Sequence, residues 1–381
     1  MKSLNLPYNP RIDQLRWLAA TIVFLFHFYL EYRGHGGASL DSAWLGLATE
    51  GHTGVGLFFT LSGMLLMQIA LHQKQLVYSD FIRNRFLRIF PLYFTVFLLA
   101  TSIGRDKFVP QDIFYLLTSN LGLAPTSGSA ITGAAWSISL EFLFYMVFPF
   151  LARFTLESGA RYLLSLLVLM LFFKLAAFTV NPNSTLMYFS TFVGRFDQFL
   201  IGMLAALTLH HHDAWLRRYA GWLLPLTALL VVCNSALQAH VARFNTEPHS
   251  IFWIFWSMLE SGGWAALIVS WLAWDKQLPA WLEHTLCHGG KISFSFYLLH
   301  MAVIHIAGEW VVTAPVLTGH VRIDWLLSML ILYGITWAMA TLCFATIEKP
   351  FLRMRRNYAA DRAAVLGSID GKNNQSTSRE R

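Results

Sequence analysis

Ten stretches of this chain are apolar over roughly the 20 residues that a helix needs to cross a bilayer core of about 30 Å. Hydrophobic residues make up 56% of the sequence and charged residues only 13%, about half of the roughly 25% usual in soluble domains. So few charges cannot cover the surface of a soluble enzyme, and the apolar content excludes a disordered chain. The sequence therefore predicts an all-α polytopic membrane protein with spans at 15–31, 52–72, 86–103, 136–152, 162–180, 186–209, 221–238, 251–274, 292–313 and 325–347.

The placement of basic residues predicts the orientation of these spans. With the N-terminus in the cytoplasm, 21 of the 28 Lys and Arg residues fall on cytoplasmic segments and two fall inside spans. The remaining five fall on outer loops, so the positive-inside rule favours both termini on the cytoplasmic side. The net charge of +7 is then explained by these loops and not by a nucleic-acid partner.

The domain organisation follows from the same pattern. Residues 1–357 form one predicted transmembrane domain, and the polar segment 358–381 is predicted to be a disordered cytoplasmic tail. The longest outer loop, 104–135, is either a connector or a contact for substrate, and its apolar part 113–123 is too short to span.

No metal site or disulfide framework is expected. The chain has three cysteines without a CxxC pair, and Cys233, Cys287 and Cys343 lie in or beside apolar runs, which is typical of packing residues. Consecutive side chains point in different directions, so the run 210–212 of three histidines is a poor metal site.

The first span carries two polar side chains that we interpret together. Arg16 and His27 are 11 residues apart, so they lie on one face of a helix, about 16 Å apart along its axis. Ionisable groups inside a membrane are costly and are candidates for function. The pair indicates a path from the cytoplasmic rim to an imidazole in the outer half, although an interface arginine and a hydrogen-bonded core histidine would fit the same pattern.

Two further segments supply candidates from the second span and from the cytoplasmic loop that follows it. Ser62 and its neighbour Gly63 permit a close helix approach in the second span. Arg83, Arg85 and Arg88 stand at the entry to the third span, and guanidinium groups suit phosphate oxygens. Positive-inside anchoring is the alternative role for these arginines.

The fourth and ninth spans supply the remaining candidates. Glu141 lies about 7 Å below the outer end of its span, at a depth comparable to that of His27, where a carboxylate can orient an imidazole. The residues around it and in the ninth span that we expect to be structural or to line substrate are Trp136, Ser139, Tyr145, Tyr297 and His300. In the sixth span, Arg195 and Asp197 either offset each other's charge or pair elsewhere.

These segments together resemble the membrane-bound acyltransferase family 3, which includes bacterial O-acetylases of surface polysaccharides. The matching pieces are Arg16 with His27, 58–63, 83–93, 136–145, 293–300 and 348–350. They occur in the family order and span about 12–351, nearly the whole chain. The chain departs from the family at Phe142, where many members have a second acidic residue, and at Ala302, where many have proline.

The resemblance implies a ten-helix domain that takes an acyl group, such as acetyl, from cytoplasmic acyl-CoA to a hydroxyl acceptor, often a saccharide or glycolipid. It implies essential roles for Arg16, His27, Arg85 and Arg88 in an enzyme of the bacterial inner membrane. No metal cofactor is expected. Our hypothesis is that the arginines, with Arg83, hold the phosphates, and that His27 acts as a base or carries the acyl group transiently. A solute transporter or proton-coupled permease is the rival class.

Overall fold

The computed structural model describes residues 5–35, 42–73, 76–103, 136–180, 185–241, 250–311 and 321–357. Within these ranges every regular element is a helix, which confirms the all-α class. The long loop 104–135 and the tail 358–381 lie outside the described residues. The helices are α1 (Pro10–Gly34), η1 (Ala43–Leu45), α2 (Gly46–Thr49), α3 (Thr53–Gln73), α4 (Tyr78–Ile103), α6 (Trp136–Ser158), α7 (Ala160–Val180), α8 (Thr185–Ser190), α9 (Phe192–Val241), α10 (Phe252–Ala273), α11 (Ala280–Val311), α12 (Val321–Cys343), the π-helical turn η5 (Phe344–Glu348) and α13 (Lys349–Leu352).

Eight helices of the described part are long and apolar enough to cross a membrane. The first predicted span, α1, is not among them, because polar residues such as Arg16 and His27 interrupt its apolar run. Helix α9 has 50 residues with a non-helical backbone at His212 (φ −121°, ψ 22°), so it contains two of the predicted spans. All ten predicted spans therefore fall on helices, while the span count and the orientation stay predictions.

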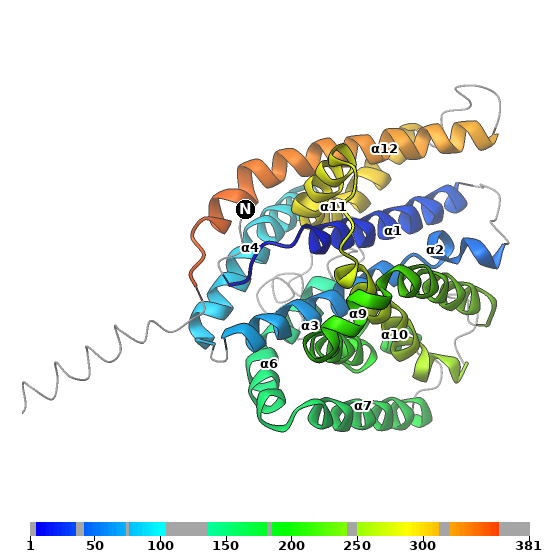
Figure 1. Cartoon of the computed structure of the whole chain (residues 1–381). Coiled ribbons are helices and arrows are strands. Elements are labelled where there is room, and N and C mark those ends of the chain that lie inside the picture. The colour runs from blue at the N-terminus through cyan, green and yellow to red at the C-terminus, as the bar shows by residue number, and fades with distance from the viewer. Residues whose placement is uncertain are drawn as a thin grey trace, which may run out of the picture.

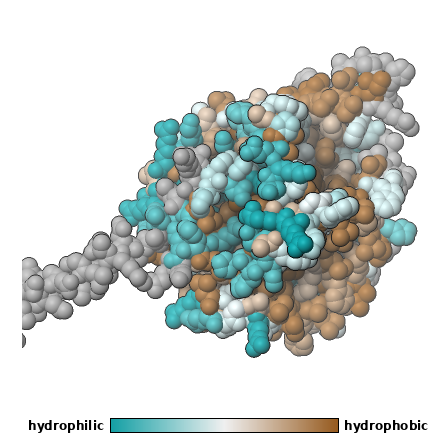
Figure 2. Space-filling model, viewed as in Figure 1, coloured by the Kyte–Doolittle hydropathy of each residue, from teal (hydrophilic) through white to brown (hydrophobic). Residues whose placement is uncertain are grey.

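Helices α1 and α3 lie between α12 and α7, which form opposite edges of the bundle in Figure 1. Helix α1 packs mainly on α11, and α3 and α10 pack mainly on α9. Hydrophilic residues gather over the left and centre of the view in Figure 2, where α4 and the start of α1 lie. Exposed apolar side chains such as Val168 and Phe172 of α7 mark a surface suited to lipid.

The crossing of α3 and α9 depends on two glycines. A Cβ atom at Gly63 would lie 2.1 Å from the Phe199 carbonyl oxygen, and one at Gly202 would lie 2.0 Å from the Thr60 carbonyl oxygen. Two backbones approach this closely only where side chains are absent. The predicted close approach at Gly63 is thus confirmed, with Gly202 as its partner.

We expect Gly202→Ala to lower the thermal midpoint of the detergent-purified protein, because the new methyl group must push α3 away from α9. Overpacking of this kind costs about 1–3 kcal/mol. Gly221 of the same helix has no atom within 4 Å of its ideal Cβ, so Gly221→Ala should be neutral or raise the midpoint through helix propensity. Equal midpoints for the two variants would contradict the close approach.

Candidate active site

Helix α1 brings Arg16 and His27 onto one face, as expected from their spacing. Asn9 caps the helix by accepting a hydrogen bond from the Arg11 backbone N–H at 3.0 Å, and Pro10 occupies the first turn, where its missing N–H costs nothing. The helix is unbroken to Gly34. The 11-residue spacing therefore holds in the structure.

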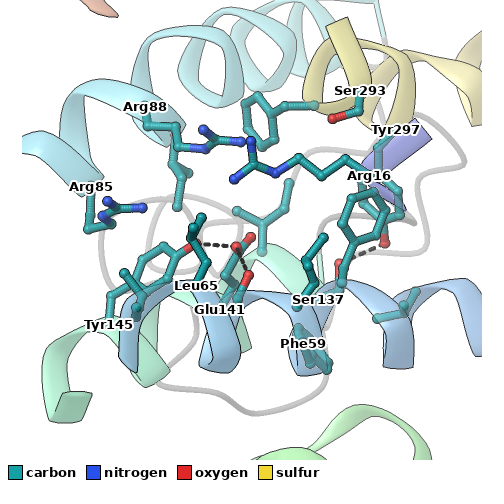
Figure 3. Close-up of a pocket in the computed structure, with 18 residues that line it drawn as sticks. Arg16, Phe59, Leu65, Arg85, Arg88, Ser137, Glu141, Tyr145, Ser293 and Tyr297 are labelled. Atoms are coloured by element: carbon teal, nitrogen blue, oxygen red, sulfur yellow. Dashed lines mark hydrogen bonds between the residues drawn. The ribbon is translucent and has the colours of Figure 1, made fainter. Parts of the chain in front are cut away.

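Arg16, Arg85 and Arg88 line one cavity of about 740 Å³, including the solvent-open space at its mouth (Figure 3). The Arg16 guanidinium forms an ion pair with Asp13 at 3.3 Å, and the Arg85 guanidinium lies 5.2 Å from the centre of the Tyr145 ring. Figure 3 shows Arg16 and Arg88 pointing toward each other across this space. Three guanidinium groups around one cavity favour an anionic ligand.

The opposite wall of this cavity is a set of hydroxyl groups around Glu141. The Glu141 carboxylate accepts hydrogen bonds from the Ser62 hydroxyl, at 3.0 Å, and from the Tyr145 hydroxyl. The Ser137 and Tyr297 hydroxyls are bonded to each other at 2.6 Å. Ser62, Tyr145 and Tyr297 thus line the cavity. Glu141 bonds to these hydroxyls, so the expected pairing of Glu141 with His27 is not found.

A second, wider cavity adjoins the first and leaves about 1140 Å³ between its atoms. Arg16, Leu65, Arg85 and Arg88 line both cavities. The second cavity adds the side chains of Lys291 and Arg355, which the sequence interpretation missed. In the sequence, only two features could have indicated these residues. Lys291 stands just before the 293–300 motif, and Arg355 lies within the basic cluster 353–356.

One phenol and two carboxylates complete this wider cavity. The Tyr8 hydroxyl donates to the Asp13 carboxylate at 2.9 Å. Burial and the neighbouring Asp13 charge raise the pKa of the Tyr8 phenol, so it remains a hydrogen-bond donor at neutral pH. Glu348 also lines the cavity and accepts a hydrogen bond from the buried Ser295. Five basic groups therefore face two carboxylates, and the cavity keeps an excess of positive charge.

Arg83 has a structural role instead of the predicted phosphate contact. Its Nη1 atom donates to the Met354 carbonyl at 3.0 Å, and it lines neither cavity. The Asn84 amide donates to the Arg356 carbonyl at 2.6 Å and accepts from the Arg356 N–H at 2.9 Å. These bonds fix the backbone on both sides of Arg355, whose side chain lines the cavity.

His27 lies beyond the arginine cavities and lines neither of them. Tyr297, at the wall of the first cavity, has its ring centre 5.6 Å from that of His300. The His300 Nε2 atom is 3.0 Å from the His27 Nδ1 atom. The order from the cavity is therefore Tyr297, His300 and His27. Neither cavity reaches His27, so the direct Arg16-to-His27 path expected along α1 is not found as a cavity among the described residues.

Trp136 and Ser139 are core residues and not cavity residues. The Trp136 ring packs 5.2 Å from the Phe189 ring centre, and the Arg195 guanidinium lies 5.8 Å from the Trp136 ring centre. Ser139 is 2% exposed. Of the two roles expected for Trp136 and Ser139, structural or substrate-lining, these contacts favour the structural one.

A separate cluster of buried charges joins α7, α9 and α10 away from the cavities. Lys174 donates to Asp197 at 2.5 Å and also bonds to Ser257. Arg195 donates to Glu260 at 3.1 Å. Arg195 and Asp197 thus pair with partners on other helices, which decides between the alternatives left open by the sequence.

The described residues hold no group of three His, Cys, Asp or Glu side chains arranged to bind a metal.

Residues 9–348 match the family model described as Acyltransferase domain. The chain belongs to this acyltransferase family. The match covers nearly the whole sequence and confirms the resemblance that the motifs indicated.

Three curated relatives show how far the similarity of this acyltransferase to known proteins extends. Nodulation protein 10 of Rhizobium leguminosarum bv. viciae is 26% identical over 386 residues, 94% of this chain and 97% of the relative. Acyltransferase MdmB of Streptomyces mycarofaciens is 30% identical over 162 residues, 40% of this chain and 41% of the relative. A putative O-acetyltransferase of Staphylococcus aureus (strain MSSA476) is 22% identical over 387 residues, 92% of this chain and 58% of the relative. The matches thus span less than two thirds of the MdmB and S. aureus proteins.

No solved structure matches this acyltransferase. The family, together with eight membrane-capable helices in the described part, makes the chain a multi-pass membrane acyltransferase. This confirms the predicted enzyme class and removes the transporter alternative.

Proposed function

We propose that this enzyme transfers an acetyl group from cytoplasmic acetyl-CoA to a hydroxyl group of a cell-surface or lipid-linked saccharide in the bacterial inner membrane. The observation that carries the proposal is the pair of adjoining cavities that share Arg16, Arg85 and Arg88. The wider cavity is basic, and the narrower one leads into the bundle toward Tyr297. This is the shape required for a donor with a polyanionic head and a long arm that ends in a thioester.

The wider cavity suits the phosphates of coenzyme A. Arginine binds phosphate oxygens through two parallel N–H···O bonds, and lysine binds them as a point charge. Lys291 and Arg355 add two cations to the three shared arginines. The cavity lies where α1 and α4 begin and α13 ends, at the end of the bundle that the positive-inside rule places in the cytoplasm.

The acetyl donor and the O-linked product rest on the relatives. The S. aureus relative is named a putative O-acetyltransferase, and a relative from Acidianus two-tailed virus, 30% identical over 183 residues, is named a putative acetyltransferase. The hydroxyl-lined wall around Glu141, made by Ser62, Tyr145, Ser137 and Tyr297, offers donors and acceptors for a hydroxyl-rich acceptor.

In the proposed reaction, the acceptor oxygen attacks the thioester carbonyl carbon, a C–O bond forms and the C–S bond breaks. His27 takes the proton of the acceptor hydroxyl as a general base. That proton then passes to the sulfur of the departing coenzyme A. Glu141 bonds to Ser62 and Tyr145 at the wall of the first cavity and does not orient His27.

We expect Arg85→Ala and Arg88→Ala each to raise the KM for acetyl-CoA by roughly 10- to 100-fold. A hydrogen bond to a charged group contributes about 1.5–3 kcal/mol, and 1.4 kcal/mol is a factor of ten in affinity. Lys291→Ala and Arg355→Ala should act in the same direction but less strongly. The assay is release of coenzyme A by purified protein, at low salt, where screening is weakest.

Arg153 supplies the matched control for these variants. It lies on α6 with 77% of its side chain exposed and pairs with Glu157, so Arg153→Ala should leave the KM unchanged. An unchanged KM in the Arg85 and Arg88 variants would contradict the phosphate site.

The acceptor is tested by mass spectrometry of surface glycans from cells with and without the gene. An acetyl mass gain on one sugar, present only with the gene, is the expected result. Identical glycan masses, together with intact acetyl-CoA turnover by the purified protein, would reject the saccharide acceptor and leave the donor intact.

A further inference from the structure

His27 and His300 form a hydrogen-bonded pair between α1 and α11. The His300 Nε2 atom and the His27 Nδ1 atom are 3.0 Å apart. Each ring also bonds to a backbone carbonyl through its own Nδ1 atom, His27 to Val23 at 3.0 Å and His300 to Tyr297. His300 is 1% exposed, so its ring has no water to replace these partners.

The two carbonyl contacts determine which nitrogen atoms carry protons. A carbonyl oxygen only accepts hydrogen bonds, so in each neutral ring the Nδ1 atom must be the protonated one. The Nε2 atom of His300 then has a lone pair, and the one Nδ1–H of His27 is shared between this lone pair and the Val23 carbonyl in a bifurcated bond. The Nε2 atom of His27 is left as a lone pair, and it has no hydrogen-bond partner among the described residues.

We propose that His300 is a positioning residue that fixes His27 in the tautomer whose Nε2 atom accepts the proton of the acceptor hydroxyl. This inference rests on the proposed role of His27 as the base. A neutral imidazole in water favours protonation at Nε2, which would leave no lone pair on the side away from α11. The lone pair of His300 Nε2 and the Val23 carbonyl together favour the opposite tautomer.

The same contact acts during the reaction. When His27 Nε2 takes the hydroxyl proton, both nitrogen atoms of the ring carry protons and the ring is cationic. The Nδ1–H then donates to the neutral His300 Nε2 in a charge-assisted bond, which is stronger than the neutral one. No bond of His300 itself breaks, so His300 acts through His27 and does not touch the reacting atoms.

The surrounding packing holds the pair in this geometry. The Phe26 ring centre lies 5.2 Å from that of His27, and the Tyr297 ring centre lies 5.6 Å from that of His300. Further along, a Cβ atom at Gly290 of α11 would lie 2.2 Å from the Asp13 carbonyl oxygen of α1. The two helices are therefore in close contact, which keeps the two histidines within hydrogen-bonding distance of each other.

The test compares His300→Gln with His300→Phe. A glutamine amide can accept from His27 Nδ1–H through its oxygen and donate to the Tyr297 carbonyl through its nitrogen, whereas phenylalanine fills the space without an acceptor. Because tautomer control of a catalytic imidazole is worth large factors in rate, we expect kcat to fall at least about 10-fold in His300→Phe. It should fall no more than about 3-fold in His300→Gln, with the KM for acetyl-CoA unchanged in both.

The control is His288→Phe. His288 lies on the same helix and bonds to the Thr341 hydroxyl at 3.3 Å, away from the pair, so its loss should leave kcat unchanged. A second comparison adds His300→Phe to His27→Ala. A residue that acts through His27 should cause no further loss in that background.

Equal losses in His300→Gln and His300→Phe, or a further loss in the His27→Ala background, would overturn the inference while leaving the base intact. Full activity in His27→Ala would reject the proposed function itself. If His300→Phe does not fold, nitrogen-15 NMR of histidine-labelled wild-type protein decides. We expect a neutral ring protonated at Nδ1 whose signal disappears in His27→Ala, and an Nε2-protonated ring there would contradict the assignment.

Discussion

His27→Ala should lower acyl transfer by about 10²- to 10⁴-fold, to a residual rate that can still be measured, while leaving the protein folded in the membrane. General-base catalysis contributes about 10²- to 10⁴-fold, and alanine offers neither a base nor a nucleophile. Half-buried His27 contacts its surroundings through Val23, Phe26 and His300, so the loss of its ring removes little packing. Release of coenzyme A from acetyl-CoA in the presence of acceptor-containing membranes measures the effect.

His288→Ala is the matched control, because it removes an imidazole from α11 that bonds only to Thr341 among the described residues. It should retain wild-type transfer. Wild-type transfer in His27→Ala, with normal expression and thermal midpoint, would reject the role of His27.

The second large effect is on stability. Lys174→Met should lower the free energy of unfolding by about 3–5 kcal/mol, because it leaves the Asp197 carboxylate charged and buried without its partner. Lys174 and Asp197 are each 0% exposed. A thermal midpoint in detergent, read by intrinsic tryptophan fluorescence, checks the loss.

The double variant Lys174→Met with Asp197→Leu should recover most of this stability, since it removes both charges together. Arg217→Met is the control. Its pair with Asp213 on α9 leaves 54% of the Arg217 side chain exposed, and exposed pairs contribute only about 0–1 kcal/mol. A Lys174→Met variant as stable as Arg217→Met would show that the buried pair does not hold α7 to α9.

The sequence predicted the features that depend on local pattern. Hydropathy located the spans because each depends only on a run of about 20 neighbouring residues. The helical period placed Arg16 and His27 on one face, and the small residue Gly63 indicated a close helix crossing. Cys287 is buried, as expected, whereas Cys233 is exposed on a surface of apolar neighbours.

The features it missed depend on residues far apart in the chain. Asn84 and Arg356 are separated by 272 positions, and His27 and His300 by 273. No local pattern reveals such a pair. Charge does not distinguish Arg83 from Arg85 and Arg88, so the sequence assigned all three to the phosphates. In the structure Arg83 instead donates to the backbone carbonyl of Met354. Glu141 shared a predicted depth with His27, but depth does not fix direction, and its carboxylate faces Ser62 and Tyr145.

The proposed function requires that acetyl-CoA is used from the cytoplasmic side of the membrane, and labelling of oriented vesicles measures this. Radiolabelled acetyl-CoA, which does not cross membranes, is supplied to inverted and to right-side-out vesicles that contain the enzyme and its acceptor. We expect label in the acceptor only with inverted vesicles, which expose the cavity lined by Arg16, Arg85 and Arg88. Equal labelling from both sides of the membrane would contradict a cytoplasmic donor site. Wild-type labelling in inverted vesicles that carry the double variant Arg85→Ala with Arg88→Ala would contradict the role of this cavity.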